Sequence, residues 1–80
     1  MKLKLSGRAD KQYIRATPII QRAFLKQSDF LKKDLHHPSL HAKKFGSAEN
    51  YWQARVNRSW RFYFVVQEDV YWILSIEPHS

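Results

Sequence analysis

The chain has 80 residues, no cysteine and a formal net charge of +7 at pH 7. This length fits one domain near the lower limit for a stable core, and the lack of cysteine excludes disulfide crosslinks. The core must come from five Phe, three Trp and four Tyr together with the aliphatic residues. No apolar run approaches the roughly 18 to 20 residues of a membrane span, so we expect a soluble, cytoplasmic protein with no membrane partner. Its charge attracts polyanions such as nucleic acid or an acidic protein segment.

The N-terminal half predicts one short strand and two helices. Residues 1–5 (MKLKL) alternate apolar and basic side chains, which indicates an edge strand. A brief helix is expected from residue 8 to residue 15. Thr17 and Pro18 are typical of a second helix start, and this helix runs to about Asp34 with an apolar stripe of Ile20, Phe24, Leu31 and Leu35. Residues 39–50 are polar and contain Gly46, so we predict a connection without regular structure.

Residues 51–79 carry the clearest β pattern and predict a three-stranded antiparallel meander. The first strand has Trp52, Ala54 and Val56 on one face, and the second has Phe62, Phe64 and Val66. These two apolar faces coincide only if the two residue numbers of each cross-strand pair add up to an even number. This requires a three-residue loop or a bulge near residues 58–60. Arg55 then lies opposite Tyr63, with Arg61 next along.

The third strand, residues 70–76 (VYWILSI), is apolar on both faces and is therefore expected inside the sheet, beside residues 1–5. The predicted fold class is α+β, with a short N-terminal strand, two helices and a three-stranded antiparallel meander. The helices pack on one face of the sheet, and the whole chain forms a single domain.

Arginines on the strands of a basic domain indicate a surface that contacts phosphate, because guanidinium groups bind phosphate with two hydrogen bonds. Tyr63 and Tyr51 would stack on unpaired bases, as recognition of single-stranded RNA requires. The alternative is that the arginines are solvated and paired with acidic side chains, the candidates being Glu49, Glu68 and Glu77.

RNA cleavage without a metal needs a base for the 2′-hydroxyl, a cation for the phosphorane and an acid for the leaving 5′-oxygen. Arg61 suits the second task because it stays charged on a rigid strand. His79 suits acid or base chemistry near neutral pH. Lys43 and Lys44 would hold phosphate, or act as a base if neighbouring cations lower a lysine pKa.

The four histidines, His36, His37, His41 and His79, also raise the question of a metal site. The chain has neither cysteine nor the HExxH spacing of metalloproteases, so we expect no metal and no cofactor. His36 and His37 are expected instead at the carbonyl end of the second helix.

The segment RVNRSWRFYF (residues 55–64), preceded by YW and followed at the chain end by EPHS, resembles the RelE/ParE toxin superfamily of bacterial toxin–antitoxin modules. The likeness is greatest to its HigB and YoeB branches, and HHPSLHAKK (residues 36–44) is also similar to members. The resemblance implies that Arg61 contacts the scissile phosphate, that Arg55 is the basic strand residue and that His79 is the C-terminal histidine. Pro78 and Ser80 stand where tyrosines are common. In place of the glutamate base of some members the region offers His41, Lys43 and Lys44.

The resemblance implies a toxin of a type II module that cuts mRNA, usually on the ribosome, and is held inactive by a cognate antitoxin. DNA would be bound only by the toxin–antitoxin complex. The expected catalytic residues are Arg61, His79, Lys44 and Arg55, and the expected substrate-binding residues are Lys43, Arg58, Tyr63 and His41. Three alternatives remain: a gyrase inhibitor of the same fold, an inactive homologue, and a simple RNA-binding module.

Overall fold

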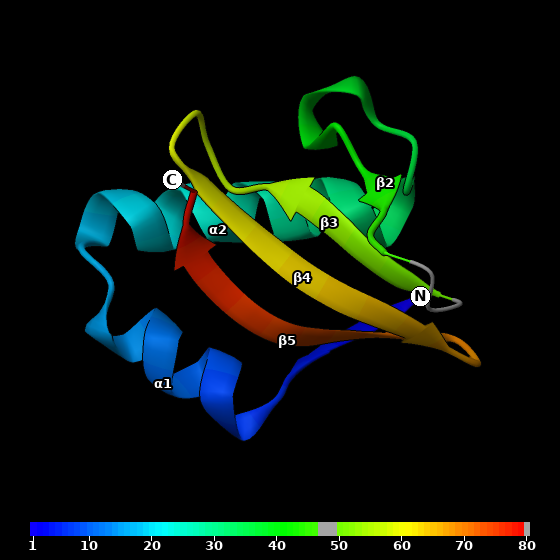
Figure 1. Ribbon diagram of the computed structural model, residues 1–80, viewed down its shortest axis with the longest axis horizontal. Helices are drawn as coiled ribbons and strands as arrows, with labels where there is room; N and C mark the ends of the chain where they lie inside the picture. Colours follow the sequence, from blue (N-terminus) through cyan, green and yellow to red (C-terminus); the bar gives the residue numbers. More distant parts are fainter. Residues whose placement is uncertain (47–49, 80) are drawn as a thin grey trace.

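The structure is a computed structural model that describes residues 1–46 and 50–79. The elements are β1 (Lys2–Leu5), α1 (Gly7–Arg15), α2 (Pro18–Lys33), a 3₁₀ turn η1 (Pro38–Leu40), β2 (Lys43–Lys44), β3 (Tyr51–Arg55), β4 (Trp60–Gln67) and β5 (Val70–Pro78). One five-stranded sheet has the order β1-β5-β4-β3-β2, in which β1 is parallel to β5 and the other pairs are antiparallel (Figure 1). Within the described residues no helix is long and apolar enough to cross a membrane. Glu49 and Ser80, considered above, lie outside this range.

Both predicted helices are confirmed, and each begins at a side-chain cap. Ser6 Oγ accepts a hydrogen bond from the Ala9 amide at 3.1 Å, and Thr17 Oγ1 accepts one from the Ile20 amide at 3.3 Å. These bonds satisfy backbone N–H groups that have no partner in the first turn. Pro18 follows Thr17 at the start of α2, where a missing N–H carries no penalty.

The prediction that residues 39–50 lack regular structure is wrong in part. This segment holds the end of η1 and the two-residue strand β2, which pairs Lys43 with Gln53 and Lys44 with Trp52. A strand this short shows no alternation in the sequence. It forms because β3 would otherwise leave its outer backbone groups without partners, and the sheet therefore has five strands.

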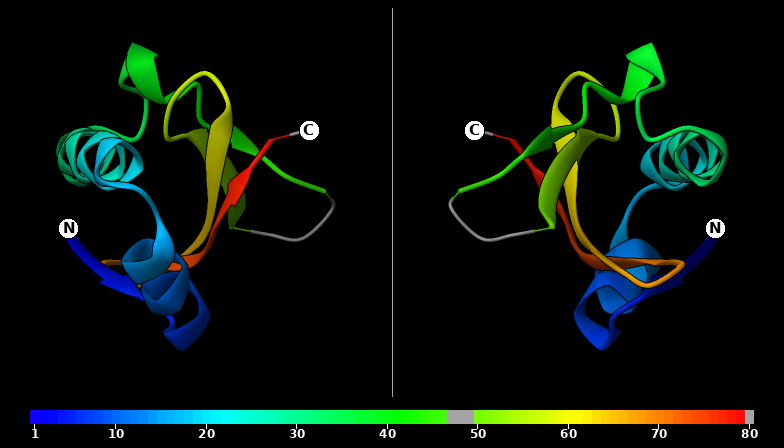
Figure 2. Two further views of the ribbon diagram at one scale, coloured as in Figure 1. Left: turned by 90° about the vertical axis from the view of Figure 1, so that its left-hand side faces the viewer. Right: turned by 90° about the vertical axis from the view of Figure 1, so that its right-hand side faces the viewer.

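Both helices lie on one face of the sheet, as predicted (Figure 2). The ring of Phe24 in α2 meets Phe62 of β4 edge to face, with centroids 5.3 Å apart, and Tyr13 of α1 contacts Phe24 at 5.9 Å. Phe62, Phe64 and Ile73 have no exposed surface. Burying such side chains contributes about 1.5–3 kcal/mol each, so this face provides most of the hydrophobic stabilisation.

A three-residue loop, Asn57 to Ser59, joins β3 and β4, which confirms the predicted even register. The Val56 amide donates to the Trp60 carbonyl at 3.0 Å, and Asn57 Oδ1 accepts from the Ser59 and Trp60 amides, both at 2.9 Å. An asparagine side chain that bonds the backbone two residues on is a common turn device.

The predicted pairing of Arg55 with Tyr63 is wrong by two residues. The loop closes directly after Val56, so Arg55 pairs with Arg61, and Tyr63 pairs with Gln53. The side chains still emerge on the predicted faces, because a shift of two residues does not change the face.

The predicted interior strand is confirmed, since β5 lies between β1 and β4. Its register with β4 shifts at Leu74, so Tyr63 pairs with Ser75 while Phe64 pairs with Ile73. The extra residue of such a bulge reverses which residues face the core. Tyr71 and Ile73 before it and Ile76 after it are consequently all buried against the helices.

Gln27 of α2 ties the helix to the segments that flank the open face of the sheet. Its Nε2 donates to the carbonyls of Ser39 and Arg55, both at 2.9 Å, and its Oε1 accepts from Ser39 Oγ at 3.2 Å.

Replacement of Gln27 by leucine leaves two carbonyls without a donor at a site where Gln27 is only 6% exposed. We predict that Gln27→Leu lowers the free energy of unfolding in urea by about 2–4 kcal/mol. The matched change Lys26→Leu at an exposed position should stay within about 0.5 kcal/mol; equal values for the two variants would contradict the bracing role.

Burial of the Tyr71 hydroxyl leads us to predict that the protein loses stability at alkaline pH. Burial raises the pKa of Tyr71 above its ordinary value of 10.0, and Asp34 raises it further. The native state therefore keeps the hydroxyl proton of Tyr71 at a pH where the unfolded chain has released it. The contribution of Tyr71 to the free energy of unfolding is complete below pH 10 and is lost as pH rises through the native pKa. Tyr71→Phe should flatten the decline in the free energy of unfolding above pH 10. Parallel curves for parent and variant would show that Tyr71 has no part in it.

Candidate functional site

The sheet face turned away from the helices presents three rows of cross-strand neighbours. The pairing places Arg55, Arg61 and Glu77 in the first row. The second row consists of Lys43, Gln53, Tyr63 and Ser75. The third consists of Phe45, whose amide donates to the Tyr51 carbonyl, then Tyr51, Val65, Trp72 and Lys4. Side-chain character thus changes along the strands from cationic to aromatic.

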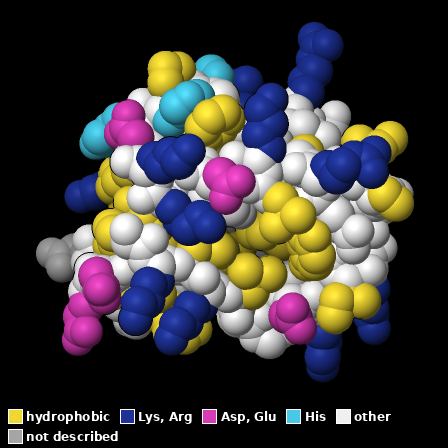
Figure 3. All heavy atoms as spheres, turned by 180° about the vertical axis from the view of Figure 1, so that it is seen from behind, with side chains coloured by type: hydrophobic (Ala, Val, Ile, Leu, Met, Phe, Trp, Pro, Cys, Tyr) yellow, Lys and Arg dark blue, Asp and Glu magenta, His cyan; other side chains and the backbone are white. Residues whose placement is uncertain are grey.

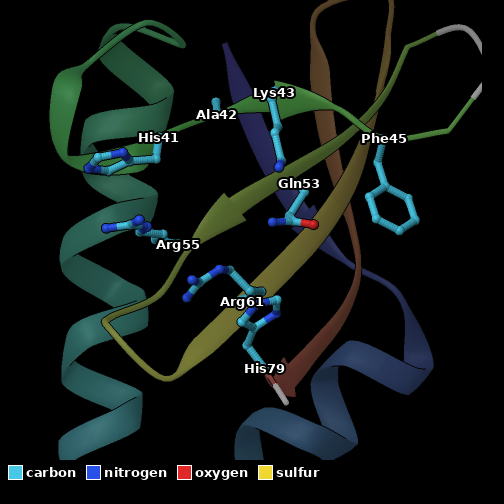
Figure 4. Close-up of a pocket in the computed structure, with 8 residues that line it drawn as sticks. All are labelled: His41, Ala42, Lys43, Phe45, Gln53, Arg55, Arg61 and His79. Atoms are coloured by element: carbon cyan, nitrogen blue, oxygen red, sulfur yellow. The ribbon is translucent and has the colours of Figure 1, made fainter.

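A cavity of about 600 Å³ opens on this face and is lined in part by members of all three rows. Figure 4 shows its lining side chains, which come from the segment around β2, from β3 and β4, and from the chain end after β5: His41, Ala42, Lys43, Phe45, Gln53, Arg55, Arg61 and His79. Five of the eight are basic or imidazole side chains, and none is acidic. A concave site with this charge attracts anions.

Arg61 is the most constrained cation of the cavity. It is 8% exposed, and its Nη1 donates to the carbonyls of Asn57 at 2.9 Å, Trp60 at 3.0 Å and Arg58 at 3.3 Å. These bonds hold one end of the guanidinium against the β3–β4 loop. Its Nε and Nη2 make no hydrogen bond to another described residue, so their N–H groups are available to a ligand.

The two cavity histidines come from opposite ends of the site. His41 follows η1 with a positive φ of 46°, a left-handed conformation that is uncommon for residues other than glycine. His79 follows β5, and its amide donates to the Ser59 carbonyl at 2.7 Å, which anchors the chain end beside the loop that holds Arg61. Figure 4 shows the imidazole of His79 next to the Arg61 side chain.

The alternative in which carboxylates neutralise the strand arginines finds no support among the described residues. Their ion pairs within 4.0 Å are Arg8–Glu77 at 3.7 Å and Lys32–Asp29 at 3.3 Å. Glu77 is the cross-strand neighbour of Arg61, yet its carboxylate lies toward Arg8 on α1. On the face seen from behind, apolar side chains gather near the centre, and basic and acidic side chains lie around them (Figure 3). Arg55 and Arg61 thus make no ion pair with the carboxylate of another described residue.

Three of the residues predicted for the site lie outside the cavity. Lys44 emerges on the other face of β2, where its Nζ lies 6.0 Å from the centre of the Trp52 ring, because neighbouring strand residues point to opposite faces. Arg58 is exposed at the loop tip and supplies a carbonyl to Arg61. Tyr63 is on the correct face but packs against Phe45 and Tyr51 beside the cavity.

Sequence reasoning missed Phe45, Gln53 and Ala42 as lining residues. Alternation along β3 already places Gln53 on the same face as Arg55. Phe45 could have been found only with β2 in place, because the pairing of Lys43 with Gln53 puts Lys43 and Phe45 on the open face. The absence of an alternation signal in residues 39–50 concealed this.

The described residues contain no group of three or more His, Asp or Glu placed to hold a metal ion. His36 and His37 lie at the carbonyl end of α2 as expected, where their amides donate to Asp34, the first to Oδ1 at 2.9 Å and the second to the carbonyl at 3.0 Å. The ring of His37 stacks on Phe30 with centroids 3.8 Å apart, and its Nδ1 lies 2.9 Å from Ser39 Oγ. It thus joins α2 to η1.

The chain has the fold of the bacterial and archaeal RelE and YoeB toxins. No family model and no curated protein matches the sequence, so this conclusion comes from solved structures. The archaeal RelE–RelB complex from Pyrococcus horikoshii is similar with a TM-score of 0.83 and 19% identity, over 99% of this chain and 94% of that one.

Two further structures show the same similarity. The YoeB dimer from Staphylococcus aureus has a TM-score of 0.84 at 14% identity, over 100% of this chain and 98% of that one. The YoeB/ParE toxin from Agrobacterium tumefaciens has a TM-score of 0.83 at 16% identity, with 100% of both chains covered. Each agrees over nearly its whole length, so the five-stranded sheet and its two helices form the complete shared fold.

The cavity generates a prediction about anions. Arg55 and Arg61 are direct cross-strand neighbours, and like charges in this arrangement repel. An anion between them relieves the repulsion, so inorganic phosphate should raise the unfolding temperature. The free energy of unfolding should increase by about 1.4 kcal/mol when the phosphate concentration is tenfold above Kd. Arg55→Gln should abolish most of this gain while leaving stability without phosphate unchanged or higher.

Arg22→Gln is the matched control, because Arg22 is an exposed arginine of α2 outside the cavity. This control also shows how much phosphate stabilises the protein without binding to the cavity, because phosphate salts stabilise folded proteins in general. Thermal unfolding in phosphate and in chloride at equal ionic strength measures the difference. The same phosphate gain in both variants would show that the cavity binds no phosphate.

Proposed function

We propose that the chain is the toxin of a type II toxin–antitoxin module and cuts mRNA without a metal, acting on the translating ribosome. The observation that carries this proposal is the cavity on the open sheet face, where Arg55, Arg61 and Lys43 lie between His41 and His79. The fold shared with RelE and YoeB supports the toxin class. The cavity residues supply the chemistry that cleavage of RNA requires.

The proposed reaction is an in-line attack of a 2′-hydroxyl on the adjacent phosphate. A base removes the 2′-proton, the 2′-oxygen forms a bond to phosphorus, and the bond from phosphorus to the 5′-oxygen breaks as an acid protonates it. The products are a 2′,3′-cyclic phosphate and a 5′-hydroxyl. Arg61 is assigned to the phosphorane, because its fixed cation has free N–H groups directed away from the loop carbonyls.

Proton transfer is assigned to the two histidines. His79 lies beside Arg61 and suits the acid that protonates the leaving oxygen (Figure 4). Lys44 lies outside the cavity, so His41 and Lys43 are the candidates for the base. His41 is assigned to the base, because it lines the cavity at the end away from His79. Arg55 and Lys43 hold the flanking phosphates.

The partner that we propose is an antitoxin protein. The RelE of Pyrococcus horikoshii was solved with RelB, and the YoeB of Staphylococcus aureus with YefM. A cavity lined by cations, with no acidic lining residue among those described, favours an acidic segment that covers it. Such a segment and the RNA phosphates would compete for the same charges.

We predict that Arg61→Ala lowers mRNA cleavage by about 10²–10³-fold, the usual effect of removing one donor to a developing negative charge. Cleavage is mapped by primer extension on translated mRNA after induction. The hydrogen bonds of Arg61 to the loop carbonyls require that the folded fraction of the variant be measured by thermal unfolding. Arg22→Ala on α2 should cut as the parent does. Growth arrest with intact mRNA in the parent would overturn the nuclease proposal and favour a gyrase inhibitor of the same fold.

We predict that His79→Gln lowers cleavage by about 10²–10⁴-fold, as expected for loss of a general acid. Substitution is preferable to truncation, because deleting residues 79–80 also removes the bond from the His79 amide to the Ser59 carbonyl. Single-turnover cleavage of a fixed mRNA in a translation extract gives the rate. Cleavage at the parental rate would exclude His79 from proton transfer.

A further inference from the structure

Phe45 forms an exposed aromatic surface beside the cavity. Its side chain is 42% exposed although it packs against two other rings. The other large apolar residues with comparable exposure are Met1 at the chain start and three helix residues, Ile14, Ile19 and Leu25, none of which lines the cavity. Among the described residues, Phe45 therefore combines an apolar ring open to solvent with a position on a cationic rim.

The ring of Phe45 is held in a fixed orientation. Its centroid lies 5.6 Å from that of Tyr51 and 5.3 Å from that of Tyr63, with interplanar angles of 69° and 70°. The two tyrosine rings are close to parallel, at 19° and 6.3 Å. Edge-to-face contacts of this kind are favourable beyond the area they bury. The tyrosines thus support the phenyl ring, and Phe45 still remains 42% exposed.

The rows of the open face place this ring at a defined distance from the cations. Alternate residues on a strand lie roughly 7 Å apart, so the third row, with Phe45, follows the second row, with Lys43 and Gln53, at that spacing. A nucleotide joins an anionic phosphate to a flat base through one sugar, and its two ends match these two kinds of side chain. Gln53, which is 9% exposed, lies on β3 between the row of Phe45 and the row of Arg55, and its side-chain amide offers both a donor and an acceptor.

We propose that Phe45, supported by Tyr51 and Tyr63, stacks on an unpaired base of the nucleotide whose phosphate occupies the cavity. This inference rests on the proposed function, since it assigns a second contact to the same RNA. Stacking of a base on an aromatic side chain is tolerant of sequence, because every base has a π face. Tyr63 then supports the stacking residue, a different role from the direct base contact expected from the sequence.

The test measures binding of a fluorescently labelled six-nucleotide RNA that carries 2′-O-methyl groups, which block cleavage. Phe45→Leu keeps the apolar volume but removes the flat ring, and it should weaken binding about tenfold. Phe45→Trp should bind as tightly as the parent or more tightly. Phe30→Leu is the matched control, because Phe30 stacks on His37 outside the cavity, and it should bind like the parent.

The same oligonucleotide with abasic sites separates stacking from other effects. The parent and Phe45→Leu should bind the abasic strand with equal affinity, since no base is present to stack. Parental affinity of Phe45→Leu for the normal strand would overturn the stacking site. So would an equal loss on both strands, which would indicate a change in the cavity itself.

A second comparison distinguishes this inference from the proposed function. If Arg61→Ala weakens binding of the oligonucleotide and Phe45→Leu does not, the cavity holds RNA and only the stacking site is wrong. If the parent binds neither strand, both proposals fail.

Discussion

The register between β3 and β4 is the constraint on which both the core and the cavity depend. The three-residue loop after Val56 makes the numbers of paired residues sum to an even value, and Asn57 stabilises that loop with two backbone hydrogen bonds. A slip of one residue would turn Phe62 and Phe64 toward solvent and Arg61 into the core. Arg61 in turn bonds to the loop carbonyls, so the cation that the register exposes also secures the register.

Repulsion between the cations of the cavity lowers the stability of the fold. Arg55 faces Arg61 across the strands, and Lys43 lies one row away, without an acidic lining residue among those described. Hydrogen bonds from the Arg61 guanidinium to neutral carbonyls hold this cation in place beside Arg55. We therefore expect an anion to stabilise the domain, in agreement with the proposed binding of RNA phosphate.

The solved RelE and YoeB structures and the cavity support different parts of the conclusion. Similarity over whole chains at 14–19% identity gives the fold. The proposed chemistry depends on residues of this chain, among them His41, which follows η1, and Phe45, which follows β2. Pro78 ends β5 beside Trp60 and lines a separate pocket, so the position where a tyrosine is common contributes nothing to the cavity here.

The sequence alone determined the helices, the interior strand and the faces of the meander, because capping residues and alternation are local signals. It also singled out Arg61, His79, Arg55, Lys43 and His41, which line one cavity. Only the tertiary structure decided the pairing of Arg55 with Arg61, the exclusion of Lys44, and the place of Phe45. The reason is that β2 has two residues and no periodic pattern of its own: it becomes a strand through the free edge of β3, a partner that lies near it in space after folding.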